Sequence, residues 1–476
     1  MLDRLRCVAC LLPLMLVGPA TARGERPNVL IILTDNQGPW TLGCYGNPDI
    51  RTPNIDRLAQ SGVLFLNAYA CNPVCSPNRA TLLSGLMPSQ HGVHSYLVSG
   101  RLQMGPHARS TLEAFRTLGE IFRASGYMCG LVGKWHLGAN LTPQEGFLDY
   151  WVTMPHGHTA TFYGAEVIED GQIRREPGYL TAFWTRHAVR FLRQAAQRYQ
   201  PFFLLLAYNG PYGLGKHLLR PARNRHADYY AQHPLPSFPR HPPHPWLFNN
   251  RQYLNNLVAM RRVAAETSGV DDGVGTVLET LEQLGLRRRT LVVYLADQGW
   301  VGGQQGFWGM GDHTRPFTLR DGMLRIPLIW SHPGLIPAGL RESRLVSIYD
   351  VPVTLVAYCG LASGWPTARP RPGRSLLPLL RGERPGAWRD AVFMEYQRVR
   401  AVRTGRWKYV YRHPDGPHEL YDLWRDPEET NNLWADRSLQ PVREALHRRL
   451  EQFFAQYADR RYDLWHGGTS QSVLLR

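Results

Sequence analysis

The sequence predicts an α/β protein with a large, mostly parallel (mixed) sheet sandwiched by helices, and a smaller C-terminal antiparallel sheet plus helix. Short unbroken apolar runs, such as Val29 to Thr34, are typical of strands buried on both faces of a parallel sheet. These runs alternate along the chain with segments of helical spacing. After Pro385 the pattern changes to short strands joined by turns. We therefore expect a large domain over 23–385 and a small α+β domain over 386–476.

The first half of the large domain predicts two strands and two helices. The strand Val29 to Thr34 precedes a helix that begins in the stretch Thr52 to Ala59, with Asn54 near its cap. Thr117 to Ser125 has helical spacing and leads into an apolar strand, Tyr127 to Val132.

The second half repeats this alternation, and the small domain departs from it. Long segments of helical spacing again precede short apolar runs, which predicts helix–strand pairs in a parallel sheet. The expected helices and strands are Tyr179 to Tyr199, Phe202 to Ala207, Val270 to Leu284 and Leu291 to Ala296. In the small domain, short strands are expected at Ala391 to Tyr396, Ala401 to Arg403 and Trp407 to Tyr411, with an amphipathic helix at Gln440 to Tyr457.

The segment 217–245 is rich in proline and histidine. Because proline removes a backbone donor, this segment is not expected to form a helix interior or a central strand. We interpret it as a long surface loop at the rim of the site. A histidine-rich metal site is the alternative, but its histidines lack regular spacing.

The N-terminus predicts export. Arg4 and Arg6 precede an apolar run, and small residues at 20–22 offer a cleavage site, so 1–22 is expected to be a signal peptide. The protein is therefore expected to be periplasmic or secreted. An exported protein can form disulfides, whose pairing the sequence leaves open. No later segment reaches the ~20 apolar residues that span a bilayer, so no membrane span is expected.

The formal net charge of +16 is spread along the chain and favours an anionic partner. A sulfated polysaccharide is one polyanion of this kind. Nucleic acid is the competing one, but the sequence contains scattered arginines and no nucleic-acid-binding motif. We therefore expect no nucleic-acid partner.

Polar residues follow several of the predicted strands. In open α/β sheets the ligand site lies outside the carboxyl ends of the strands, so these residues are expected to meet in one crevice. Each one alone is also typical of an ordinary turn. They are Asp35-Asn36, Lys134 and His136, Asn209, and Asp297-Gln298.

The stretch from Cys75 to Gly85 predicts a cysteine at the mouth of a helix. Pro77 suits the first turn, Ser76 can cap it, and Gly85 can end it. Unpaired backbone donors at that end favour an anion, and Arg79 adds a donor fork suited to an oxyanion. A buried structural cysteine beside a structural arginine is the simpler interpretation of this stretch alone.

The pattern Cys-x-Pro-x-Arg followed by Leu-Ser-Gly resembles the signature of the formylglycine-dependent sulfatases, in the alkaline-phosphatase-like superfamily. The resemblance implies that a formylglycine-generating maturation enzyme oxidises Cys75 to an aldehyde, whose hydrate is the nucleophile. The neighbouring Cys71 lacks the arginine, so Cys75 is the expected modification site. The resemblance extends over nearly the whole mature chain and makes 23–385 the catalytic domain.

Carried over residue by residue, the resemblance implies a divalent cation, normally Ca²⁺ with Mg²⁺ as the alternative. Its expected ligands are oxygens, which hard cations prefer. The resemblance also implies that Arg79 and Lys134 neutralise the sulfate group and that Lys134 or His136 assists the leaving alcohol. The expected metal ligands are Asp35, Asn36, Asp297 and Gln298. Many family members carry Asp where this chain has Asn36, and Asn or His where it has Gln298.

The substrate-binding residues are expected to include Asn209. Where many members have a histidine soon after a proline, this chain has Tyr212, and His217 is the expected substitute. Arg315, with His313 second, is expected to replace a displaced basic sulfate ligand.

The sequence thus predicts an exported Ca²⁺-dependent sulfuric ester hydrolase that acts on a sulfated small molecule or polysaccharide. The net charge favours a sulfated carbohydrate. One alternative is a phosphonate or phosphodiester hydrolase that uses the same modified cysteine. Another is an inactive homologue that binds sulfated glycans.

Overall fold

The computed structural model describes residues 26–98, 101–157, 161–366 and 368–475, so the expected signal peptide at 1–22 lies outside them. In this described part of the chain the largest sheet has eight strands in the order β14-β2-β13-β9-β1-β8-β4-β5. Its centre, from β9 to β5, is parallel, whereas β13 is antiparallel to both of its neighbours. The strands are β1 (Asn28–Asp35), β2 (Val63–Phe65), β4 (Met128–Gly133), β5 (Tyr150–Val152), β8 (Phe202–Pro211), β9 (Thr290–Ala296), β13 (Leu328–Ser331) and β14 (Leu340–Glu342).

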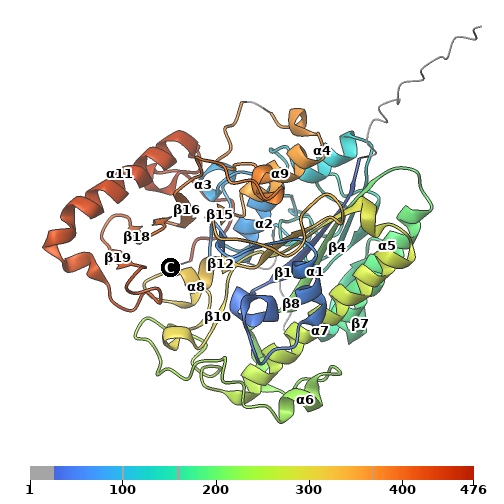
Figure 1. Cartoon of the computed structure of the whole chain (residues 1–476), viewed down its shortest axis with the longest axis horizontal. Helices are drawn as coiled ribbons and strands as arrows, with labels where there is room; N and C mark the ends of the chain where they lie inside the picture. Colours follow the sequence, from blue (N-terminus) through green and yellow to red (C-terminus); the bar gives the residue numbers. More distant parts are fainter. Residues whose placement is uncertain (1–25, 99–100, 158–160, 367, 476) are drawn as a thin grey trace, which may run out of the picture.

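Helices cover both faces of this sheet (Figure 1). Successive residues of β1 point to opposite faces, so Ile31 packs with one layer of helices and Ile32 with the other. One layer contains α1 (Pro53–Gln60), α5 (Leu180–Ala196) and α7 (Leu257–Gln283). The other contains α2 (Cys75–Ser84), α4 (Leu118–Ala124) and α9 (Asp350–Tyr358). The expected large mixed sheet sandwiched by helices is therefore confirmed.

Shorter elements decorate this framework. They are mostly two to eight residues long and carry the chain between the layers. The helices are α3 (Pro88–His91), α6 (Ala227–Ala231), α8 (Asp321–Leu324) and α10 (Leu377–Leu380). The strands are β3 (Ala68–Tyr69), β6 (Tyr163–Glu169), β7 (Gln172–Tyr179), β10 (Val301–Gly302), β11 (Trp308–Gly309), β12 (Arg325–Ile326) and β15 (Val346–Ser347).

The C-terminal part forms the expected antiparallel sheet and helix (Figure 1). Its strands are β16 (Ala391–Tyr396), β17 (Val399–Thr404), β18 (Trp407–Arg412) and β19 (Glu419–Asp422), and its helix is α11 (Gln440–Tyr457). Leu446, Leu450 and Phe454 of α11 belong to the same apolar cluster as α2 and α9. The domain boundary at 385/386 remains a prediction.

The segment 217–245 is more ordered than a surface loop. It contains α6 and part of a 3-10 helix, Lys216–Leu219, and its side chains Tyr230, Leu235 and Phe238 are buried. These side chains pack with the N-terminal half of α7 and with Trp300. The prolines limit regular structure in this segment to short helices. Burial of the apolar residues holds the segment against the core.

Candidate active site

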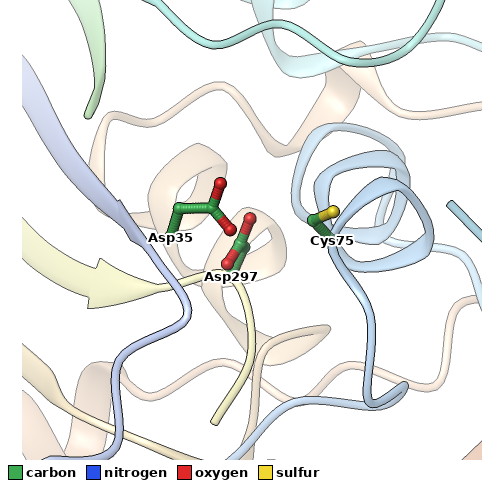
Figure 2. Close-up of side chains that lie close together, drawn as sticks. All are labelled: Asp35, Cys75 and Asp297. Carbon is green, nitrogen blue, oxygen red and sulfur yellow. The ribbon is translucent and has the colours of Figure 1, made fainter. Parts of the chain in front are cut away.

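The carboxyl ends of neighbouring strands bring the expected polar residues together. β9, β1, β8 and β4 lie side by side. Asp35 is the last residue of β1, and Asp297 and Lys134 follow β9 and β4 directly. Figure 2 shows the Asp35 and Asp297 carboxylates opposite Cys75 at the start of α2. One ligand atom from each of these three residues lies within 4.8 Å of those of the other two. The sheet therefore builds a compact acidic group beside the cysteine.

Cys75 is the first residue of α2, one residue earlier than the expected cap at Ser76. Val74 precedes the helix in an extended conformation, Gly85 ends it in the left-handed region, and the Ser76 hydroxyl donates to the carbonyl of His136 at 3.0 Å. Burial raises the pKa of the Cys75 thiol to about 12, against the lowering effect of Lys134. Because the thiolate is the nucleophilic form, the unmodified side chain is a poor nucleophile at neutral pH.

His136 lies next to Cys75 and is fixed by its ring contacts. Its Nδ1 is 3.3 Å from the Cys75 sulfur, and its Nε2 is 3.0 Å from the carbonyl oxygen of Leu97. Since a carbonyl can only accept, Nε2 carries a hydrogen, and an Nδ1 without a hydrogen can accept from the group at position 75. Gly157 covers the ring so closely that an added Cβ would lie 1.7 Å from the His136 Cδ2 atom.

Two buried cations pair with the two carboxylates. Lys134 Nζ lies 2.5 Å from Asp35 Oδ2, and Arg79 contacts Asp297 Oδ2 through Nε and a terminal nitrogen, both at 2.8 Å. Arg79 also donates to the carbonyl of Lys134 at 2.6 Å, which ties the two cations together. Burial lowers the pKa of Lys134, but the combined effect of Asp35, Cys75 and Asp297 outweighs it, so that the pKa of Lys134 is raised.

The four expected metal ligands fit a hard divalent cation. All are buried, and they offer carboxylate or amide oxygens. Gln298 Nε2 donates to Asp35 Oδ1 at 3.3 Å and contacts Asn36 Oδ1, whereas Gln298 Oε1 has no hydrogen-bond partner among the described residues. Burial and the neighbouring Asp35 raise the pKa of Asp297 to about 6. A divalent cation would relieve this crowding of buried negative charge and give the unpaired oxygen a partner.

The expected substrate-binding residues are more scattered. Asn209, in β8, accepts a hydrogen bond from Trp184 Nε1 at 2.9 Å and leaves its Nδ2 without a partner in the described part of the chain. His217 packs its ring against Phe162, with ring centroids 5.1 Å apart, and burial lowers its pKa to about 3. Among the residues that the structure describes, no hydrogen bond joins the His217 ring to Cys75, Asp35 or Asp297.

Arg315 and His313 lie in the segment that follows β11. The Arg315 guanidinium lies between the rings of Phe248 and Phe317, 4.4 and 4.2 Å from their centroids. His313 Nδ1 is 3.0 Å from Asp312 Oδ1. This segment reaches the site through Met310, whose sulfur lies 3.3 Å from Gln298 Nε2.

Tyr212 is a site residue that the sequence analysis passed over in favour of His217. It follows the end of β8, donates its backbone N–H to the carbonyl of Asp35 at 3.2 Å, and places its ring 5.7 Å from Lys134 Nζ. Its position directly after a central strand was the available signal, because the same rule identified Asn209.

The chain matches two protein-family models, and one of them covers most of its length. Residues 27–361 match the family described as Sulfatase. Residues 311–456 match the model described as N-sulphoglucosamine sulphohydrolase, C-terminal.

Curated relatives align over most of the chain. Human N-acetylgalactosamine-6-sulfatase is 30% identical over 389 residues, covering 76% of this chain and 67% of the relative. The N-acetylglucosamine-6-O-sulfatase of Bacteroides thetaiotaomicron is 25% identical over 521 aligned positions, covering 93% of this chain and 88% of the relative.

Solved structures share the fold. One, determined in complex with its substrate D-glucosamine-2-N,6-O-disulfate, has a TM-score of 0.70 at 23% identity and covers 91% of this chain and 98% of its own. The phosphonate monoester hydrolase of Agrobacterium radiobacter has a TM-score of 0.66 at 23% identity, covering 91% of this chain and 97% of its own.

Proposed function

Because the chain belongs to the sulfatase family and is a sulfate ester hydrolase, we propose that it releases inorganic sulfate from a sulfated carbohydrate with a formylglycine nucleophile made from Cys75 and a bound Ca²⁺. The observation that carries this proposal is the approach of Asp35, Asp297 and Cys75 to within 4.8 Å. Oxygen ligands for a cation and the side chain to be modified thus face the same space.

The environment of Cys75 supports its modification. A buried thiol with a raised pKa contributes little nucleophile at neutral pH, whereas the hydrated aldehyde offers a hydroxyl at the same place. In the neutral tautomer fixed by the Leu97 carbonyl, His136 Nδ1 is positioned to accept a hydrogen from that hydroxyl. The maturation enzyme that forms the aldehyde is a proposed partner.

The chain's own cations bind and orient the sulfate group. Arg79 and Lys134 lie on either side of the carboxylates and can each donate to a sulfate oxygen. When bound by Asp35, Asn36, Asp297 and Gln298, Ca²⁺ supplies additional positive charge for the sulfate oxygens. Near-complete burial of all these side chains excludes water and strengthens these interactions.

A carbohydrate is the substrate class that we propose. The relatives named above act, by their names, on sulfated amino sugars. The net charge of +16 favours an anionic saccharide at the surface. We also propose that the protein is exported, since residues 1–22 have the composition of a signal peptide. Among the described residues no helix has the length and apolar character of a membrane span.

The test compares two cysteine variants made with the maturation enzyme present. Sulfate release is measured from a panel of defined sulfated saccharides and from 4-nitrophenyl sulfate. Cys75→Ala should abolish release from every substrate, whereas Cys71→Ala, the matched control in the segment before α2, should retain it. Mass spectrometry of the Cys75 peptide should show the aldehyde in the wild type.

Other results would redirect the proposal. Undiminished sulfate release by Cys75→Ala would refute it. Faster turnover of a matched aryl phosphonate or phosphodiester would identify the protein as a hydrolase of those esters. An unmodified Cys75 thiol, together with glycan binding and no turnover, would identify a sulfated-glycan-binding homologue.

A further inference from the structure

Tyr212 presents an uncommitted hydroxyl group beside the reacting centre. The residue follows β8, between the ends of β1 and β4, and its backbone is tied to Asp35 at 3.2 Å. Its φ of 34° lies in the left-handed region, where a bulky residue is strained. Within the described residues its hydroxyl makes no hydrogen bond, although its ring lies over Lys134 at 5.7 Å. The backbone is therefore strained at the residue that carries this hydroxyl group.

The neighbouring histidine, lysine and arginine are already engaged. Both ring nitrogens of His136 have partners, Cys75 at 3.3 Å and the Leu97 carbonyl at 3.0 Å. Lys134 Nζ is held by Asp35 at 2.5 Å, and Arg79 by Asp297 at 2.8 Å. In the proposed function, His136 serves the nucleophile, and Lys134 and Arg79 serve the sulfate oxygens. The oxygen that leaves with the sugar needs a separate donor.

We infer that Tyr212 is a catalytic residue that donates its hydroxyl hydrogen to the bridging oxygen of the sulfate ester. The inference rests on the proposed function, which it deepens by assigning the leaving-group donor.

The step balances as follows in bonds and charges. As the nucleophile's hydroxyl gives its proton to His136 Nδ1 and its oxygen bonds to sulfur, the bond from sulfur to the bridging oxygen breaks, and its electron pair stays on that oxygen. The Tyr212 proton passes to the same oxygen and yields the sugar alcohol. Solvent water returns a proton to the phenolate, whose charge the Lys134 ammonium stabilises meanwhile.

Leaving groups of different acidity test this role. A sugar alkoxide is strongly basic and depends on a donor, whereas 4-nitrophenolate leaves readily without one. We expect Tyr212→Phe to lower kcat/KM for a sulfated monosaccharide by about 100-fold or more and for 4-nitrophenyl sulfate by less than about 3-fold. Phenylalanine keeps the ring over Lys134, so the thermal unfolding midpoint should change little.

Tyr96→Phe is the matched control. Tyr96 is a second half-buried phenol close enough to Cys75 and Asp312 to feel their charge, and its loss should not distinguish the two substrates. Lys134→Ala should impair both substrates alike, because it removes a sulfate-binding charge. Each variant is measured on the formylglycine-containing holoenzyme with Ca²⁺ present.

Two results would overturn the inference. Equal losses on both substrates in Tyr212→Phe would make Tyr212 a positioning residue for Lys134. No loss on either would leave it without a role in the reaction. Both results presuppose a wild type that hydrolyses the two substrates, so failure of the wild type itself would count against the proposed function instead.

Discussion

At the scale of single residues, the site is a set of balanced buried charges. Lys134 pairs with Asp35 and Arg79 pairs with Asp297, so the two cations and two carboxylates cancel. A divalent cation therefore makes the loaded site net positive, which suits an anionic sulfate ester. Asn36 contributes to this result, because a carboxylate at that position would offset half of the added charge.

Replacing Asn36 with Asp should tighten Ca²⁺ binding. A third carboxylate increases the attraction for a hard cation. Without the cation, the same carboxylate is an uncompensated buried charge. We expect a lower dissociation constant in calorimetry, and a larger rise of the unfolding midpoint between EDTA and Ca²⁺ than in the wild type. Unchanged affinity would show that Asn36 is not a ligand.

Replacing Gly157 with Ala should impair catalysis without unfolding the protein. An alanine Cβ would lie 1.7 Å from His136 Cδ2, so the imidazole has to move. We expect kcat to fall by at least about 10-fold, since small displacements of catalytic groups have effects of this size or greater. Gly405→Ala, where an added Cβ meets nothing within 4 Å, is the control and should retain activity.

The sequence anticipated the residues that follow strands better than those in loops. Asp35, Lys134 and Asp297 meet because parallel strands end at one edge of the sheet. His217 and Tyr212 could not be ranked in the same way, because the path of the chain after β8 depends on tertiary packing against Phe162 and Lys134. The roles of all these residues remain predictions.

At the scale of elements, a buried ionic group connects the C-terminal sheet to α8. Asp321, at the start of α8, lies 2.5 Å from Lys408 Nζ in β18 and 3.1 Å from Arg403 Nε in β17. Glu429 accepts the backbone N–H of Asp321 at 2.7 Å and lies 3.8 Å from Lys408. Removing one member of such a group leaves the others buried without compensation.

Glu429 should make stability depend on pH. Burial raises its pKa to about 7, although Lys408 opposes this, whereas its unfolded pKa is about 4.3. The folded state therefore holds the proton more tightly, and this stabilisation is complete below about pH 4.3 and is lost as pH rises towards 7. We expect the free energy of unfolding of Glu429→Gln to fall less than that of the wild type over this range.

Chemical denaturation at several pH values measures this difference. Glu428→Gln is the matched control, because the adjacent Glu428 is exposed, and its slope should equal that of the wild type. A steeper decline in Glu429→Gln would contradict the assignment.

The element boundaries also show where sequence patterns fail. The helix expected from Val270 begins at Leu257 instead. Its first half was missed because the buried Arg262–Glu266 ion pair interrupts the apolar pattern of α7. The β6–β7 hairpin was not foreseen, since its strands are charged rather than alternating. Asp170-Gly171, both with positive φ, was its available signal.

At the scale of the whole molecule, the fold class was predictable because the pattern of apolar residues along a strand shows whether one or both faces of its sheet are buried. Alternate apolar side chains of the central strand β1 pack against two separate helix layers. An unbroken apolar run is expected of a strand that is buried on both faces in this way. The packing of 217–245 against Trp300 was not predictable, because no local pattern encodes which distant surface a proline-rich segment covers.

The basic surface should make polymer turnover sensitive to salt. Screening weakens long-range attraction between a chain of net charge +16 and a polyanion, whereas a small monoanion loses less. Raising NaCl from about 0.05 to about 0.5 M should raise KM for a sulfated polysaccharide several-fold more than KM for 4-nitrophenyl sulfate. Equal increases in KM for both substrates would show that salt acts on binding at the active site and not on attraction to the basic surface.

The adjacency of β9, β1, β8 and β4 separates two tasks within the molecule. In the proposed reaction, bond breaking takes place at the ends of these strands, and the connections that follow the strands recognise the alcohol. Directed diversification can therefore be confined to the connection after β8, with Tyr212 held constant, and to the segment after β11. Such a library would explore new sugars while the reaction chemistry stays in place.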